Sequence, residues 1–204
     1  MQAQTSKLPE FSVPQADRPH SFGYQLIHTT PDNHDAVVKW YQTLFCGSVR
    51  SDAEDIPTSD LLDAGQETIC IIARPDLTPP PVKMARGVLH MAWFYNSLAE
   101  LVYVCRHARD NGIVPYEVMT SPVLMQIYFR DPAGNVVELG VDAHDTSRQA
   151  QDAMLGAADL RIPGKIDDWY YDLNKLIAML EAGIPDHEIF NTQRFQELAA
   201  SGRF

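Results

Sequence analysis

The chain has 204 residues, of which 45% are hydrophobic and 21% charged, as expected of one substantial globular domain with an appendage. Its formal net charge of −11, from 27 acidic and 16 basic residues, argues against a nucleic-acid partner, because such proteins need a basic face. No apolar stretch is as long as a membrane span, and the first 18 residues lack the layout of a signal peptide, so we expect a cytoplasmic protein with no membrane partner.

The first half of the chain predicts a strand, a helix and three further strands. Residues 1–21 are polar and rich in proline, and we expect an extended arm there. The β-prone segment Tyr24–Thr30 precedes turn residues and a helix that ends at Gly47. The apolar stripe of this helix consists of Val37, Val38, Tyr41, Leu44 and Phe45. The three short strands are expected at Ser48–Asp52, Ser59–Asp63 and Glu67–Ala73. A proline-rich linker follows over Arg74–Ala85.

The same order of elements starts again after the linker. Gly87–Tyr95 is a candidate strand, and Ser97 with Glu100 forms a capping box for a helix that Gly112 ends. Three strands are then expected at Pro115–Met119, Val123–Arg130 and Val136–Val141. The two halves superpose with a period of about 62 residues, which is the signature of an internal repeat. We therefore predict an α+β fold of two βαβββ modules, over about residues 22–74 and 86–142.

Residues 143–204 are different in kind and are expected to form a C-terminal helical tail. The tail is mostly polar up to Asp168, and an amphipathic helix is predicted around Leu173–Ala182. Between them lies the aromatic run Trp169, Tyr170 and Tyr171. This run is expected either to cover a cavity as an aromatic lid or to pack the tail onto the domain.

The stretch Val123–Val141 predicts a hairpin whose register follows from its turn. Asp131-Pro132-Ala133-Gly134 fits a type I turn followed by a left-handed glycine, which places Tyr128 opposite Glu138. One face is then wholly apolar, with Met125, Ile127, Phe129, Val137, Leu139 and Val141. The other carries Gln126, Tyr128, Arg130, Val136, Glu138 and Gly140. The mostly polar face indicates a cavity lined by the sheet, although a solvated sheet surface gives the same pattern.

His28 and His90 occupy equivalent mid-strand positions in the two modules. Together with Glu138 they are candidate metal ligands, because two imidazoles and one carboxylate leave three positions open on an octahedral metal. The alternative is that each histidine is a hydrogen-bonded core residue. The three cysteines are too scattered to form a zinc cluster.

These motifs resemble the vicinal oxygen chelate superfamily, which includes glyoxalase I, bleomycin-resistance proteins and extradiol dioxygenases. The resemblance rests on the strand–histidine–helix pattern at His28 and His90 and on the segment Asp131–Leu139, and it covers about residues 22–142. It implies that the two modules form a cupped mixed sheet around one metal, whose ligands map onto His28, His90 and Glu138.

Within the superfamily the pattern is most similar to short extradiol dioxygenases. The segment Thr68–Ala73 lacks the fourth ligand of glyoxalase-type members, and the spacing of Tyr128, Pro132, Gly134 and Glu138 looks like that of the dioxygenases. This similarity implies an Fe(II) enzyme, with Mn(II) as a substitute, that uses O2 on a catechol-like or other vicinal-oxygen small molecule, with Tyr128 as a catalytic residue. The sequence departs from the dioxygenases in having no additional histidine within residues 75–86 or 117–123.

Two other functions remain open on the same scaffold. One is a metal-dependent isomerase or lyase of the glyoxalase type, which uses the metal without oxygen. The other is a non-enzymatic binding protein of the bleomycin-resistance kind. Whether the chain forms a homodimer is also left open by the sequence.

Overall fold

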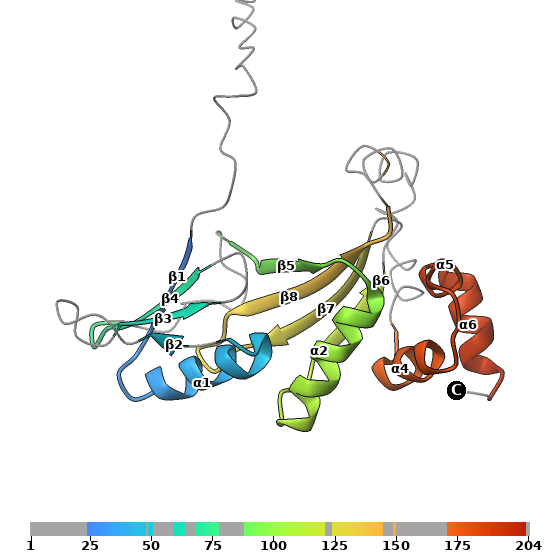
Figure 1. The fold of residues 1–204 in the computed structure, drawn as a ribbon. Coiled ribbons are helices and arrows are strands. Elements are labelled where there is room, and N and C mark those ends of the chain that lie inside the picture. Colours follow the sequence, from blue (N-terminus) through green and yellow to red (C-terminus); the bar gives the residue numbers. More distant parts are fainter. Residues whose placement is uncertain are drawn as a thin grey trace, which may run out of the picture.

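A computed structural model shows, in the residues that it describes, two small mixed sheets flanked by helices, followed by three C-terminal helices (Figure 1). It describes residues 24–47, 49–50, 59–63, 68–77, 88–120, 124–144, 149 and 171–202. The predicted arm at residues 1–21 and most of the predicted linker lie outside the described residues. No helix in the described part of the chain is long and apolar enough to cross a lipid bilayer.

The two modules have the same order of elements and the same topology. The first contains β1 (Tyr24–Thr29), α1 (His34–Phe45), β2 (Val49–Arg50), β3 (Ser59–Asp63) and β4 (Thr68–Ala73). The second contains β5 (Met91–Tyr95), α2 (Leu98–Asp110), β6 (Glu117–Thr120), β7 (Leu124–Arg130) and β8 (Val136–Asp142). The sheet orders are β1-β4-β3-β2 and β5-β8-β7-β6, and in each sheet only the pair of first and last strands is parallel. The predicted duplication is therefore confirmed.

The end of α1 and the start of β5 differ from the prediction. Helix α1 ends at Phe45 with Cys46 rather than Gly47 as its cap: Cys46 has the left-handed φ of 51°, and the N–H groups of Cys46 and Gly47 both bond back to the carbonyl of Gln42. Strand β5 begins only at Met91, so His90 precedes the strand and our placement of it in mid-strand is wrong. Met91 lies opposite Val137, the second residue of β8, so His90 lies level with Val136 at the very start of β8, where the ladder ends.

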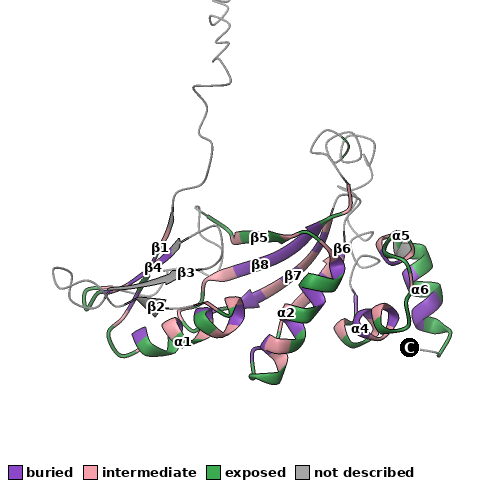
Figure 2. Cartoon of the chain, viewed as in Figure 1, coloured by how far each residue is buried: buried purple, intermediate pink, exposed green. Residues whose placement is uncertain are grey.

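The helices α1 and α2 cover one face of the sheets, and a single hydrophobic cluster fills the space between them. Figure 2 shows buried residues along β7, β8, α1 and α2. The modules contact each other through these helices and through the buried hydrogen bond that Tyr41 donates to Asp131 at 3.0 Å. The described strands form two separate sheets, in which β1 and β5 are edge strands, so the continuous cup implied by the resemblance remains a prediction.

The described part of the tail contains α4 (Leu173–Glu181), α5 (Asp186–Phe190) and α6 (Thr192–Ala200), and it docks on the second module. Its anchor is Tyr171, whose N–H donates to the Val118 carbonyl at 2.8 Å and thereby extends the edge of β6. The Tyr171 ring is buried and stacks on Phe195 with 3.6 Å between centroids, and its hydroxyl donates to Ile189. Tyr171 is thus a packing residue rather than part of a lid, while Trp169 and Tyr170 lie outside the described residues.

Candidate metal centre

The site is built on the β7–β8 hairpin, whose turn has the predicted form. Gly134 takes a φ of 91° and its N–H bonds to the Asp131 carbonyl at 3.0 Å. The buried Asp131 carboxylate accepts from the backbone and side-chain N–H groups of Asn135, at 2.7 and 2.8 Å, and from the hydroxyl of Tyr41. Because Tyr41 lies on α1, this carboxylate joins the turn of the second module to the helix of the first.

The observed register confirms the predicted alternation of the two strands. Tyr128 pairs with Glu138 and Arg130 with Val136. The apolar residues of the hairpin are all buried in the core: Met125, Ile127, Phe129, Val137, Leu139 and Val141. Tyr128 and Glu138 therefore project from the opposite face of the sheet, away from the helices.

Glu138 and His90 are in direct contact. The distance from His90 Nε2 to Glu138 Oε2 is 2.9 Å, and Glu138 is only 4% exposed whereas the His90 side chain is 32% exposed. Burial raises the pKa of Glu138, and the neighbouring phenol of Tyr128 and the charge of His90 offset part of this rise. A nearly buried carboxylate beside an imidazole is a donor set that suits a divalent metal of intermediate hardness.

His28 does not join this pair in the structure. It lies on β1, on the exposed side of the strand, with Ile27 and Thr29 buried on the other side. The described residues contain no group of three or more histidine, cysteine or acidic side chains that could hold a metal ion. The structure thus brings together two of the three predicted ligands, because the third belongs to the other sheet.

Tyr128 stands beside the pair with its proton held in place. Its hydroxyl donates to Gln126 Oε1 at 2.8 Å, and its ring centroid lies 5.6 Å from that of His90. Burial first, and then the charge of Glu138, raise the pKa of the Tyr128 phenol above its ordinary value. The phenol therefore stays protonated at neutral pH and can serve as a hydrogen-bond donor. The role of Gln126 was not anticipated, although it belongs to the polar face that the register predicts.

The exposed ring of Phe94 lies one row further along the sheet from Glu138. Phe94 pairs with Gly140, two residues after Glu138 on the same face of β8. A Cβ atom on Gly140 would lie 3.1 Å from Phe94 Cε1 and 3.2 Å from the Met125 carbonyl oxygen, so only glycine leaves the ring its present position. Phe94 is 52% exposed and offers an apolar surface next to the carboxylate. The sequence did not predict this ring next to the site, because its position depends on the pairing of β5 with β8.

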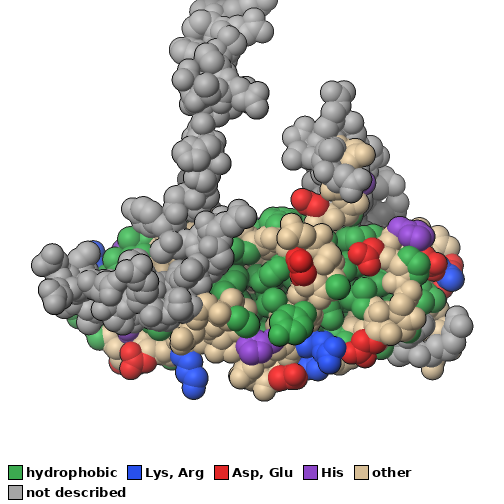
Figure 3. Space-filling view, viewed as in Figure 1, with side chains coloured by type: hydrophobic (Ala, Val, Ile, Leu, Met, Phe, Trp, Pro, Cys, Tyr) green, Lys and Arg blue, Asp and Glu red, His purple; other side chains and the backbone are tan. Residues whose placement is uncertain are grey.

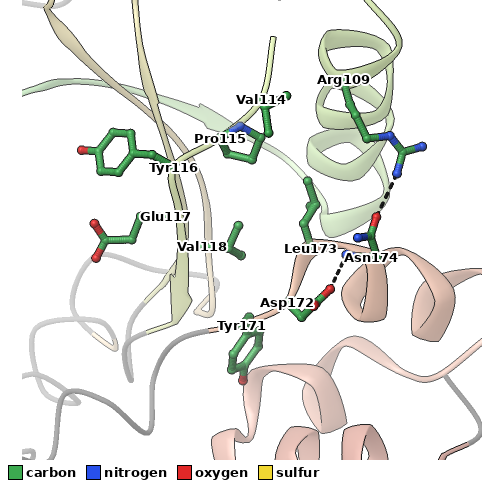
Figure 4. A pocket seen from close by; sticks show the side chains of 10 residues that line it. All are labelled: Arg109, Val114, Pro115, Tyr116, Glu117, Val118, Tyr171, Asp172, Leu173 and Asn174. Carbon is green, nitrogen blue, oxygen red and sulfur yellow. Dashed lines mark hydrogen bonds between the residues drawn. The ribbon is translucent and has the colours of Figure 1, made fainter. Parts of the chain in front are cut away.

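Two cavities lie near the site but contain neither His90 nor Glu138. One, of about 270 Å³, lies between α2, β6 and the start of the tail, where Arg109 donates to Asn174 and Asp172 caps α4 (Figure 4). The other, of about 470 Å³, is bordered by Phe94, Asn96, Ser97, Asp142 and His144. On the face in Figure 3, the basic side chains of the described residues are scattered among hydrophobic and acidic ones, in keeping with the acidic composition.

Comparison with known proteins gives a family for the region that carries the site. The profile of the Glyoxalase/Bleomycin resistance protein/Dioxygenase superfamily matches residues 25–139. A solved glyoxalase/dioxygenase from Nostoc punctiforme has the same fold, with 17% identity and a TM-score of 0.50, over 66% of this chain and 99% of that chain.

Two curated relatives from Rhodococcus globerulus match the same region. Biphenyl-2,3-diol 1,2-dioxygenase 3 is 35% identical over 118 residues, which are 56% of this chain and 57% of that protein. Biphenyl-2,3-diol 1,2-dioxygenase 2 is 24% identical over 135 residues, which are 66% of this chain and 70% of that protein. The chain thus matches little more than half of the length of the first relative.

Proposed function

Since the chain belongs to the glyoxalase, bleomycin-resistance and dioxygenase superfamily, we propose that it is a metal-dependent extradiol dioxygenase acting on a catechol-like small molecule. The observation that carries the proposal is the 2.9 Å contact of His90 with the buried Glu138, beside a protonated Tyr128. All three residues lie within the region matched by the family profile.

The proposed metal is Fe(II), with Mn(II) as a substitute, held by His28, His90 and Glu138. The donor types fit, because two imidazole nitrogens and one carboxylate oxygen with no thiolate suit such ions. Contact between two of the ligands and the orientation of His28 away from the core support this assignment. When bound, the metal would lower the pKa of a substrate hydroxyl and couple the oxidation of the substrate to the reduction of O2.

The chain itself supplies orientation and proton handling around that centre. Glu138 is held at the edge of the core, so its charge is poorly screened and acts strongly on a bound cation. The protonated Tyr128 would donate a hydrogen bond to an oxygen of the reacting substrate, and Gln126 positions it by accepting the same proton in the resting state. The ring of Phe94 would pack against the aromatic body of the substrate.

The decisive experiment measures oxygen uptake and ring-cleavage product for a panel of catechols. The protein is purified anaerobically and loaded with Fe(II), and 2,3-dihydroxybiphenyl is included because it is the substrate in the relatives' names. We expect the protein to consume O2 and to form the ring-cleavage product in equal molar amounts. Turnover that proceeds without O2 would instead indicate an isomerase or lyase, and tight ligand binding with no metal would indicate a binding protein.

A further inference from the structure

Arg130 is a cation on the same face as the candidate metal centre. It pairs with Val136, and the next residue of β8, Val137, is the partner of Met91, so His90 adjoins the same row of the sheet. Neighbouring strands are about 4.8 Å apart, which places the backbone of Arg130 about 10 Å from the start of β5. The Arg130 guanidinium is turned toward the side of β6, where it lies 4.9 Å from the ring of Tyr116, so it would meet the end of a bound small molecule that is farthest from His90 and Glu138.

In the described part of the chain, Arg130 contacts an aromatic ring rather than a carboxylate. Its guanidinium carbon lies 4.9 Å from the centroid of Tyr116, and the part of the chain that the structure describes shows no ion pair for it. Glu117, which follows Tyr116 and pairs with Tyr128, forms no ion pair with Arg130. A guanidinium stacked on a ring keeps the N–H donors along its edge free for a planar acceptor.

A series of neighbouring rings connects the Arg130 guanidinium to the two candidate ligands His90 and Glu138. The Tyr116 ring lies 6.3 Å from the ring of Tyr128, which in turn lies 5.6 Å from the ring of His90. Figure 4 shows the Tyr116 ring extending away from α2 and the tail, so it does not fill the cavity that it borders. Among the described residues, this face of the sheet therefore presents, in order, the two candidate ligands, the phenol of Tyr128, the ring of Tyr116 and the guanidinium of Arg130, which has no carboxylate partner.

We propose that Arg130, supported on the ring of Tyr116, binds a carboxylate substituent of the catechol-like substrate. The inference rests on the proposed function and adds to it a preference for aromatic diols that carry an acid group. A carboxylate can accept two parallel hydrogen bonds from a guanidinium. The chain has a net charge of −11 and repels anions in general, so binding an acidic substrate requires a local cation such as Arg130.

The test compares the binding of catechol and 3,4-dihydroxybenzoate to the Fe(II)-loaded protein under anaerobic conditions by calorimetry. The wild type should bind the carboxylate more tightly, and Arg130→Gln should weaken its binding about 10- to 100-fold while leaving catechol unchanged. Tyr116→Leu should reduce the preference, and Tyr116→Phe, which keeps the ring, should preserve it. Lys39→Gln removes an exposed positive charge from α1, on the opposite side of the sheet, and should change neither affinity.

The outcomes separate this inference from the proposed function. If both ligands bind equally to the wild type, or if Arg130→Gln and Lys39→Gln behave alike, the carboxylate site is wrong while the dioxygenase proposal stands. If neither diol binds to the metal-loaded wild type, both proposals fail. Circular dichroism and urea unfolding of each variant show whether a loss of affinity comes from the altered side chain or from misfolding.

Discussion

Glu138 is the residue on which the proposed chemistry depends most. It is a carboxylate buried at the edge of an apolar core, and two functional groups, the imidazole of His90 and the phenol of Tyr128, interact with it. Burial raises its pKa, so the ionised form is costly unless a cation compensates the charge. A metal ion would satisfy the carboxylate and the imidazole together, which explains why a protein would keep them side by side.

The ligand assignment predicts which side chains are needed for metal binding. Glu138→Ala and His90→Ala should abolish binding of Fe(II) at stoichiometric concentration, because each removes a donor from the pair in contact. His28→Ala should do the same if the third ligand is correctly assigned. His187→Ala is the matched control, since His187 is exposed on α5 in the tail. Metal content is measured by elemental analysis after anaerobic dialysis, and full occupancy in any of the first three variants would remove that residue from the ligand set.

Removal of one oxygen atom tests the role of Tyr128. Tyr128→Phe should leave metal content and folding unchanged, because the ring and its packing are retained. If the phenol donates a hydrogen bond or a proton in the transition state, kcat should fall by roughly 10²- to 10⁴-fold while substrate affinity changes much less. Gln126→Leu should give a smaller decrease, since Gln126 only orients the hydroxyl. The hypothesis is falsified if Tyr128→Phe turns over a verified substrate at the wild-type rate.

Among the elements, the β7–β8 hairpin determines the geometry of the site. Its turn sets the register that places Tyr128 opposite Glu138, and a shift of one strand by one residue would put the two side chains on opposite faces of the sheet. The same turn is joined to α1 by the hydrogen bond from Tyr41 to Asp131, so the first module helps to hold the hairpin of the second. The stability of this turn is therefore coupled to the packing between the modules.

Substitutions in this turn should lower the stability of the protein. Asp131→Ala removes the acceptor of three hydrogen bonds and should reduce the free energy of unfolding by about 2–4 kcal/mol, since bonds to charged groups are the strong ones. Tyr41→Phe removes one of the three and leaves both from Asn135, so about 1 kcal/mol is expected. The midpoints of urea unfolding measure both effects. Equal destabilisation by the two variants would show that the turn contributes little beyond its contact with α1.

At the scale of the whole molecule, the candidate site belongs to both modules only if His28 takes part. The structure joins the modules through α1 and α2, whereas the two sheets have no ladder between their edge strands β1 and β5 in the described residues. A shared metal ion would be a second connection between the modules, on the other side of the sheets. Metal binding should then stabilise the whole fold rather than one hairpin.

Metal loading should raise the melting temperature of the wild type. A ligand at 100 times its Kd stabilises the native state by about 2.7 kcal/mol, which corresponds to roughly 5–10 °C for a chain of this size. Glu138→Ala should show no such shift, and addition of a chelator should reverse it in the wild type. Thermal unfolding followed by circular dichroism provides the measurement. An equal shift in Glu138→Ala would mean that the stabilising metal binds elsewhere.

The sequence alone determined the features that depend on local chemistry. Turn residues and alternation predicted the hairpin over Val123–Val141 and its register, and the structure has it over Leu124–Asp142. The repeat of strand, helix and strands predicted two modules of like topology. These signals are local because a turn type and a period of two or 3.6 are written into neighbouring residues. The family resemblance stated from the same motifs is confirmed by the family profile.

Tertiary structure decided which side chains meet. The contact of His90 with Glu138, the stacking of Arg130 on Tyr116 and the docking of Tyr171 on Val118 each join elements that are distant in the sequence. The position of His90 before β5 likewise depends on where its partner strand begins. Such contacts depend on how one element packs on another, and the pattern of neighbouring residues along the chain does not determine that packing. For the same reason the sequence could identify His28 as a candidate ligand but could not place it beside the other two.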